Sequence, residues 1–171
     1  RYIERVSLFD GDEGLYERKW VSEEPAISSD GRYVVFSTFD PFADRNTGVY
    51  IFDRELDEST TFGALDFGSY FYAPDISADG NFIAAAYRYN PIDGDSVERL
   101  IIKEWAVEPE NVTVIEPLNE NSPYFDAPSI SADGCRVAFE FKYEDSDDIR
   151  DIYLYDCDSE DPPTLISVAA N

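Results

Sequence analysis

Pro25-Ala-Ile-Ser-Ser-Asp-Gly31 is a stretch that the chain repeats twice more, as Pro74-Asp-Ile-Ser-Ala-Asp-Gly80 and as Pro128-Ser-Ile-Ser-Ala-Asp-Gly134. An apolar segment follows each copy, at residues 32–38, 81–87 and 135–141. These segments are short and rich in β-branched and aromatic residues, so each predicts a β-strand. Glycine adopts positive φ readily, and Asp-Gly is therefore suited to a tight hairpin turn. We interpret the three aspartates of these turns, Asp30, Asp79 and Asp133, as structural residues.

Two further predicted strands follow each copy of the repeat. The third strand of the three units covers residues 49–53, 100–104 and 152–156, and the fourth covers residues 60–65, 112–116 and 164–167. With the short Pro-x-Ile-Ser strand, each unit has four strands. Four-stranded units of about fifty residues in series match the blades of a β-propeller, which predicts an all-β fold of antiparallel blades.

The repeat resembles the WD-like repeat of TolB-type β-propellers. The resemblance rests on Pro-x-Ile-Ser-x-Asp-Gly, on the Val-Ala-Phe-like strand after it, and on Val49-Tyr-Ile-Phe-Asp-Arg54. The second unit departs from this pattern at Lys103-Glu-Trp105. The resemblance implies a propeller of the kind found in periplasmic, secreted and surface proteins. It implies less about function, because one fold serves many roles and function depends on the loops.

The repeat boundaries divide the chain into three blades and one extra strand. The blades are expected at residues 20–66, 70–117 and 124–168, and residues 1–8 are expected to form the outer strand of a preceding blade. A closed propeller needs at least about four blades. We therefore expect either a piece of a larger propeller or a self-associating chain, with the remaining blades or a second copy as the partner.

Composition excludes several classes of function. The 171 residues include 37 acidic and 13 basic side chains, and this net charge of -24 argues against a nucleic-acid partner. No apolar run approaches the length of a spanning helix, so no membrane insertion is expected. The chain has no histidine, which excludes a Ser-His-Asp triad, and it has neither a Gly-x-Ser-x-Gly elbow nor a glycine-rich phosphate loop. We expect a protein that is not an enzyme.

The predicted hairpin loops opposite the Asp-Gly turns are acidic. Their candidate calcium ligands are Asp44, Asn46, Asp93, Asp95, Glu98, Asp145, Asp147 and Asp151. Asp-x-Asp and Asp-x-Asn spacings place two hard oxygen ligands within reach of one calcium ion, although no loop has the full EF-hand pattern. The alternative is a set of solvated acidic hairpin tips. No cofactor is certain from the sequence, and calcium is the one candidate.

Aromatic residues gather in the segments that are expected to join the blades on that same face. The candidates for partner binding are Trp20, Tyr70, Tyr72, Tyr124 and Phe125. Aromatic rings beside carboxylates can bind a sugar, a peptide or a basic segment of a partner. The alternative is that some of these rings fill the space between blades.

Two cysteines are placed symmetrically in the third unit. Cys135 begins its second strand and Cys157 ends its third, and both are equally far from Ser146. Such positions face each other in an antiparallel hairpin and fit a cross-strand disulfide, which indicates an oxidising compartment. The alternative is a pair of free buried thiols.

These observations favour a non-catalytic propeller module that binds a protein or a glycan. We expect it to act outside the cytoplasm, in the periplasm, in the secreted fraction or on the cell surface. Two other functions fit the same sequence: the gating domain of a larger hydrolase or peptidase, and a calcium-dependent adhesive or structural protein.

Overall fold

The computed structural model describes residues 3, 4, 6, 21–39, 48–63, 69–91, 93–107, 111–117, 124–142 and 150–167. These residues form twelve strands: β1 (Val21–Ile27), β2 (Tyr33–Phe39), β3 (Gly48–Asp53), β4 (Glu58–Thr61), β5 (Ser69–Ile76), β6 (Phe82–Tyr89), β7 (Val97–Glu104), β8 (Asn111–Ile115), β9 (Tyr124–Ile130), β10 (Arg136–Lys142), β11 (Arg150–Asp156) and β12 (Thr164–Leu165). No helix that could cross a membrane occurs in this part of the chain.

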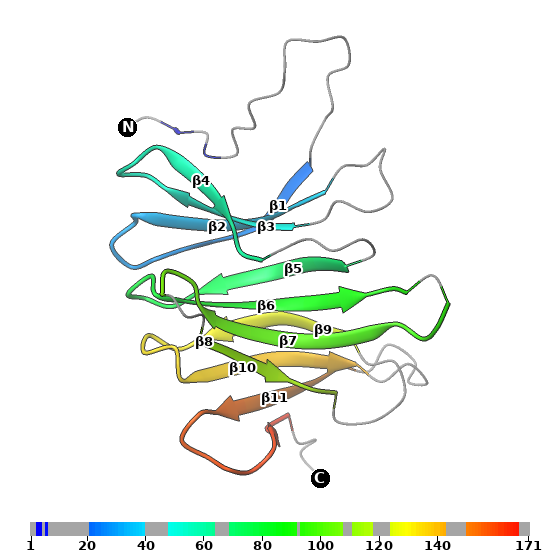
Figure 1. The fold of residues 1–171 in the computed structure, drawn as a ribbon. Helices are drawn as coiled ribbons and strands as arrows, with labels where there is room; N and C mark the ends of the chain where they lie inside the picture. Colours follow the sequence, from blue (N-terminus) through cyan, green and yellow to red (C-terminus); the bar gives the residue numbers. More distant parts are fainter. Residues whose placement is uncertain are drawn as a thin grey trace.

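The strands form three antiparallel sheets of four consecutive strands each. We call β1 to β4 blade 1, β5 to β8 blade 2 and β9 to β12 blade 3. Figure 1 shows the blades stacked face to face along the chain, from blue through green to red. The first strands of successive blades contact each other, β1 with β5 and β5 with β9, so they form the inner side of the stack. The predicted all-β fold of four-stranded propeller blades is confirmed.

Each Asp-Gly turn is closed by its own serine and aspartate. In blade 1 the Ser28 hydroxyl donates to Asp30 Oδ1 at 2.6 Å and accepts from the amide of Tyr33 at 3.0 Å. The hydrogen bond from Ser28, followed by one from the amide of Arg32 to Asp30 Oδ1 at 2.9 Å, lowers the pKa of Asp30. The three turn glycines, Gly31, Gly80 and Gly134, have φ of 74°, 78° and 73°. The structural interpretation of the three aspartates is confirmed.

Two of these glycines, Gly80 and Gly134, are in close contact with the preceding blade. A Cβ on Gly80 would lie 2.6 Å from Cδ2 of Tyr33 in blade 1, and one on Gly134 would overlap the ring of Phe82 in blade 2. Trp105 packs edge-on against Tyr33, with ring centroids 5.3 Å apart, and its Nε1 donates to the carbonyl of Gly80 at 2.7 Å. The departure of blade 2 from the repeat pattern at Trp105 therefore strengthens its junction with blade 1.

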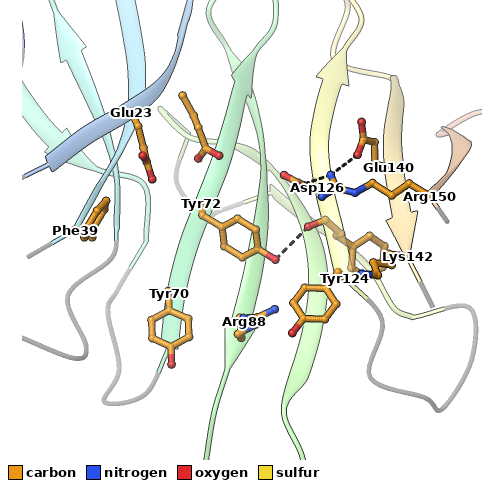
Figure 2. Close-up of a pocket in the computed structure, with 12 residues that line it drawn as sticks. Glu23, Phe39, Tyr70, Tyr72, Arg88, Tyr124, Asp126, Glu140, Lys142 and Arg150 are labelled. Carbon is orange, nitrogen blue, oxygen red and sulfur yellow. Dashed lines mark hydrogen bonds and ion pairs between the residues drawn. The ribbon is translucent and has the colours of Figure 1, made fainter. Parts of the chain in front are cut away.

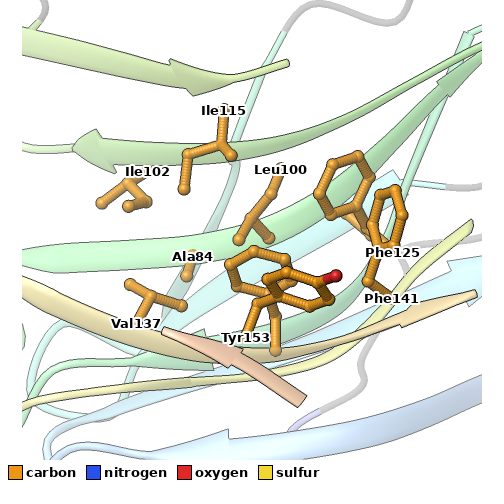
Figure 3. Close-up of a cluster of buried hydrophobic side chains, with 10 residues drawn as sticks. Ala84, Leu100, Ile102, Ile115, Phe125, Val137, Phe141 and Tyr153 are labelled. Carbon is orange, nitrogen blue, oxygen red and sulfur yellow. The ribbon is translucent and has the colours of Figure 1, made fainter. Parts of the chain in front are cut away.

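Blade 2 is covered on both faces by apolar side chains. The cluster between blades 1 and 2 consists of Val35, Val49, Ile51, Phe62, Ile76, Ile83 and Ala85. The cluster between blades 2 and 3, shown in Figure 3, consists of Ala84, Ala86, Leu100, Ile102, Ile115, Phe125, Val137, Phe139, Phe141 and Tyr153. Successive residues of β6 alternate between the two clusters, as expected for a strand with two buried faces.

The first strand of each blade is longer than the sequence indicated. β1, β5 and β9 begin several residues before the proline, and a bulge in the pairing with the second strand lets each one continue. The residue before proline has positive φ in all three strands: 54° at Glu24, 46° at Ala73 and 43° at Ala127. The fourth strand of blade 1, expected at residues 60–65, is Glu58–Thr61. Of residues 1–8, only 3, 4 and 6 are described, and none of them is in a strand.

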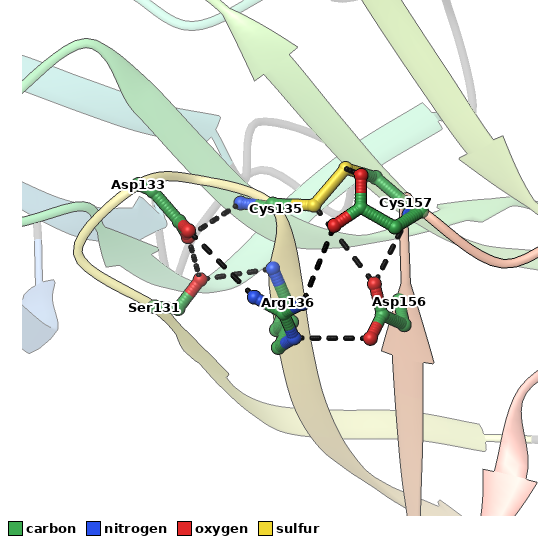
Figure 4. Close-up of a disulfide and its surroundings, with 7 residues drawn as sticks. Ser131, Asp133, Cys135, Arg136, Asp156 and Cys157 are labelled. Carbon is green, nitrogen blue, oxygen red and sulfur yellow. Dashed lines mark hydrogen bonds and ion pairs between the residues drawn. A yellow bond between two sulfur atoms is a disulfide. The ribbon is translucent and has the colours of Figure 1, made fainter.

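A disulfide joins Cys135 and Cys157, with their Cα atoms 5.1 Å apart. It lies next to the β10 and β11 register pair Arg136 and Asp156, so the hairpin is symmetric about Ser146 as predicted. Figure 4 shows the disulfide beside the Asp-Gly turn of blade 3, where Arg136 Nε donates to Asp156 Oδ2 at 3.0 Å. The predicted cross-strand disulfide is confirmed.

Candidate functional site

A pocket of about 530 Å³ opens at the inner side of the three blades. Its lining residues are Glu23, Glu24, Phe39, Tyr70, Tyr72, Arg88, Tyr124, Phe125, Asp126, Glu140, Lys142 and Arg150. These residues lie in the first halves of the inner strands, at the ends of the second strands and, for Arg150, at the start of the third strand of blade 3, which is the end of the blades away from the Asp-Gly turns. Figure 2 shows Tyr72 between Glu23 on one side and Arg150 on the other.

A buried carboxylate, Glu98, organises the middle of the pocket. The hydroxyl of Tyr72 donates to Glu98 Oε2 at 2.8 Å, with the carbonyl oxygen of Phe125 3.1 Å from the same hydroxyl. Arg88, the cross-strand neighbour of Glu98, donates through Nε to Glu98 Oε1. The Arg88 guanidinium also stacks over the ring of Tyr124, 4.3 Å from its centroid. Together these contacts fix Tyr72 and Tyr124 relative to each other.

Burial shifts the pKa values of Glu98, Tyr72 and Arg88. Glu98 is 2% exposed, and burial raises its pKa against the opposing effect of the hydrogen bond from Arg88. Burial and the nearby Glu98 carboxylate raise the pKa of Tyr72, so its hydroxyl remains a donor at neutral pH. Burial lowers the pKa of Arg88, but Glu98 raises it by more, so Arg88 remains a cation.

Other carboxylates of the pocket join strands within a blade or between neighbouring blades. Arg150 Nη1 bridges Glu140 at 2.6 Å and Asp126 at 3.1 Å, which ties β11 to β10 and β9. Glu24 Oε2 accepts from the Ser37 hydroxyl at 2.7 Å and from the bulge amide of Ala73 at 2.8 Å. The hydrogen bond from Ala73 to Glu24 links blade 2 to blade 1.

Glu23 differs from these carboxylates. Its side chain is exposed and has no hydrogen bond or ion pair with any residue that the structure describes. Phe39 lies two residues beyond Ser37, the register partner of Glu23, so both side chains are on the same face of blade 1. The acidic side of the pocket therefore has a carboxylate available for a ligand.

The structure brings three of the predicted aromatic residues together: Tyr70, Tyr72 and Tyr124 line the pocket. They lie within β5 and β9, so the prediction that they join the blades was wrong; the bulge before each proline extends these strands. Phe125 also lines the pocket from β9, but its ring is buried between blades 2 and 3, which agrees with the alternative that some of these rings fill the space between blades; its part in partner binding stays a prediction. Trp20 lies outside the described residues.

The predicted calcium ligands are not gathered at one place in the described part of the chain. Asp44, Asn46, Asp145 and Asp147 lie outside the described residues. Asp93 and Asp95 are exposed in the hairpin between β6 and β7 and remain candidates. Glu98 was wrongly placed in that loop: it is in β7, because pairing with β6 extends to Tyr89 and Val97.

The last of the calcium candidates, Asp151, is in β11 and accepts a hydrogen bond from the Ser167 hydroxyl at 3.0 Å. Three metal-ligating side chains do converge at Cys135, Cys157 and Asp158, but the two sulfur atoms are bonded to each other. Calcium binding thus stays a prediction that rests on the acidic loops alone.

Sequence reasoning missed the charged residues that line the pocket: Glu23, Glu24, Arg88, Asp126, Glu140, Lys142 and Arg150. One signal was available, because Arg88 and Glu98 are directly opposed in the hairpin of β6 and β7. Opposite charges at opposed positions of a hairpin form ion pairs, so the strand register would have predicted this one. The others depend on how the blades stack, which the repeat alone does not specify.

These blades and their inner pocket define a β-propeller protein. No protein-family model and no curated protein matches the sequence. Among solved structures, the chain is similar to a putative TolB from Agrobacterium tumefaciens, with 17% identity and a TM-score of 0.58 over 85% of this chain and 48% of that one. It is also similar to a chain from a study of two prolyl endopeptidases, with 20% identity and a TM-score of 0.57 over 85% of this chain and 22% of that one.

The fold is therefore that of a TolB-type propeller, and the chain spans about half the length of the TolB structure. At these identities the likeness shows the fold and leaves the role open.

Proposed function

We propose that the chain is a non-catalytic binding module that holds part of a protein or glycan partner in the inner pocket. The observation that carries this proposal is the convergence of Tyr70, Tyr72 and Tyr124 with charged side chains from all three blades around one cavity of about 530 Å³. Cavities of this size, with aromatic walls and a few placed polar groups, are typical of ligand-binding sites.

The state of the carboxylates supports binding over hydrolysis. A glycoside hydrolase needs one carboxyl group as acid and a second as base or nucleophile, both facing the substrate. In this pocket Asp126 and Glu140 share Arg150, and Glu24 accepts hydrogen bonds from Ser37 and Ala73. Glu98 has the raised pKa of a general acid, but it is buried behind Arg88 and Tyr72.

The disulfide supports a location outside the cytoplasm. Disulfides persist in oxidising compartments and are rare in reducing ones. The bond between Cys135 and Cys157 therefore favours a periplasmic, secreted or cell-surface protein.

Binding is tested by screening a displayed peptide library and a glycan array with three proteins. These are the natural sequence, the pocket variant Tyr70→Ala with Tyr124→Ala, and the control Tyr155→Ala near the disulfide. We expect to find ligands that bind the natural sequence and the control but do not bind the pocket variant. Ligands that bind all three equally, or that are cleaved on incubation, would contradict the proposal.

We also propose that further blades or a second copy of the chain complete the propeller ring. Ile27 of β1 is 57% exposed and lies beside Val34, its register partner, on the face of blade 1 away from blade 2. Because the chain covers 48% of the TolB structure, further blades or a second copy would cover this face. Light scattering after size-exclusion chromatography distinguishes a dimer from a monomer, and a monomer whose native chain has no further blades would contradict ring completion.

The likeness to the prolyl endopeptidase chain favours a second candidate, a propeller domain that controls access to a hydrolase. This chain covers 22% of that chain. The mass of the native protein and its turnover of peptide substrates test this candidate, and a native chain without a hydrolase domain would rule it out.

A further inference from the structure

We propose that the ligand of the inner pocket is a cationic protein segment, with an arginine or lysine side chain that pairs with Glu23 beside the ring of Phe39. This inference rests on the proposed binding function and specifies its ligand. Glu23 and Phe39 line the same pocket and share one face of blade 1. The side chain of Glu23 is exposed and its carboxylate has no partner among the described residues, so its charge is available.

The charge of the pocket favours a cation. Its lining has the carboxylates of Glu23, Glu24, Asp126 and Glu140 and the cations of Arg88, Lys142 and Arg150. The buried Glu98 adds one more carboxylate directly behind Arg88. Arg88 is paired with Glu98, and Arg150 is paired with Asp126 and Glu140. The remaining potential is negative and is reinforced by the net charge of -24.

Arg88 shows how this pocket holds a guanidinium. It pairs with a carboxylate on one side and stacks on Tyr124 on the other, 4.3 Å from the ring centroid. Glu23 and Phe39 offer the same combination of carboxylate and aromatic ring on the blade 1 side of the pocket, as Figure 2 shows. No cationic side chain of the described residues pairs with Glu23. The pocket thus has one such site filled from its own chain and a second one open.

The same contacts disfavour a glycan. Sugars bind on the open faces of aromatic rings through many hydrogen bonds to free polar groups. In this pocket Arg88 covers one face of Tyr124, and the hydroxyl of Tyr72 is used by Glu98. The hydroxyl of Tyr70 accepts from Asn90 Nδ2 at 2.7 Å. A cation at Glu23 needs none of these groups.

The test uses two capped peptides that differ only in charge, Gly-Arg-Gly-Arg-Gly and the same peptide with citrulline in place of arginine. Affinities are measured by isothermal titration calorimetry at about 0.15 M salt, where distant charges are screened. We expect the arginine peptide to bind about tenfold more tightly than the citrulline peptide, since the ion pair is lost in the latter. Glu23→Gln should remove most of this difference and leave the citrulline peptide unchanged.

A matched control removes the same charge away from the pocket. Glu58 is exposed in β4 and does not line the pocket, so Glu58→Gln should leave the arginine peptide within about twofold of its original affinity. Equal binding of both peptides, or equal effects of the two substitutions, would overturn the inference.

The outcome also separates this inference from the proposed function. If neither peptide binds but ligands from the screens still require Tyr70 and Tyr124, the proposal of a cationic ligand is wrong. The proposal that the chain is a binding module is then still supported. A glycan that requires Glu23 and the tyrosines leads to the same conclusion. If no ligand from peptides or screens depends on the pocket, both proposals fail.

Discussion

Thr38 is a buried polar residue whose hydroxyl has no hydrogen-bond partner in the described part of the chain. Its neighbour Ser37 donates to Glu24, and Ser28 and Ser77 donate to the aspartates of their turns. A buried hydroxyl without a partner costs the free energy of its desolvation. At the scale of single residues, Thr38 is thus a position where the described part of the fold leaves this cost uncompensated.

We predict that Thr38→Val stabilises the protein. Valine keeps the β-branched shape of threonine at this fully buried position and removes the unpaired hydroxyl. The free energy of unfolding, measured with urea, should rise by about 1 kcal/mol. Ser37→Ala is the control, because it removes a hydroxyl that has partners and should lower stability. A loss of stability in Thr38→Val would mean that the hydroxyl is satisfied in solution.

We predict that Gly134→Ala is strongly destabilising. The new Cβ would overlap the ring of Phe82, and alanine would also have to adopt a φ of 73°. The two effects together should lower the free energy of unfolding by about 2–4 kcal/mol, as for other strained or overpacked sites. Ala132→Ser in the same turn is the control, since blade 1 has serine at the equivalent position 29, and it should be nearly neutral. Equal stability of the two variants would contradict the glycine contact.

At the scale of elements, backbone amides of the inner strands link the blades. Carboxylates of the preceding blade accept them: Glu24 binds the amide of Ala73 in the bulge of β5, and Asp75 binds the amide of Ile130, which follows the bulge of β9, at 2.8 Å. Burial raises the pKa of Asp75, despite the hydrogen bond from Ile130. The hydrogen bond from Ile130 is therefore favourable, but the negative charge on the half-buried carboxylate of Asp75 is unfavourable to the folded state.

We predict that Asp75→Asn gains stability relative to the natural sequence as the pH rises. Because the folded-state pKa of Asp75 is above its ordinary value of 3.8, its contribution to stability is present at low pH and is lost as the pH rises through the folded pKa. Asparagine keeps an acceptor for Ile130 and does not titrate. Urea unfolding between about pH 4 and pH 7 measures the difference. Asp93→Asn in an exposed loop is the charge-matched control, and the same pH trend in both variants would contradict the assignment to Asp75.

We predict that loss of the disulfide destabilises the protein by about 2–4 kcal/mol, because the bond restrains a 22-residue separation in the unfolded chain. The double variant Cys135→Ser with Cys157→Ser should unfold at a lower urea concentration than the oxidised protein. Reduced natural protein should match the double variant. An unchanged midpoint in both would show that the bond contributes nothing to stability.

Some elements follow from the sequence and others do not. The Asp-Gly turns and the symmetric cysteines were predictable, because local turn chemistry and strand register determine them. The early start of the inner strands was not, because a residue before proline rarely has the positive φ seen at Ala73 and Ala127. The pocket was half predictable: aromatic residues were placed on the correct end of the blades, but the burial of Phe125 and Glu98 depends on packing between blades.

At the scale of the whole molecule, the net charge of -24 opposes the compact fold. Added salt screens the repulsion between the acidic side chains, because the screening length falls from about 30 Å at 0.01 M to about 3 Å at 1 M. The few described ion pairs, such as Arg136 with Asp156, offset only part of the excess.

We predict that the free energy of unfolding at neutral pH rises when sodium chloride is raised from about 0.01 M to about 1 M. Urea unfolding at fixed pH measures this effect. Near pH 4 carboxylates are partly protonated, so the same increase in salt should have a much smaller effect. A decrease at neutral pH would mean that the ion pairs outweigh the general repulsion.

The contact between ring and glycine has a direction along the chain. The ring comes from the earlier blade, as with Tyr33 and Phe82, and the glycine from the later one, as with Gly80 and Gly134. Blade 2 carries both halves of the contact. An in-frame duplication of its coding segment would therefore place a ring against a glycine at every new junction, so this contact is copied together with the blade.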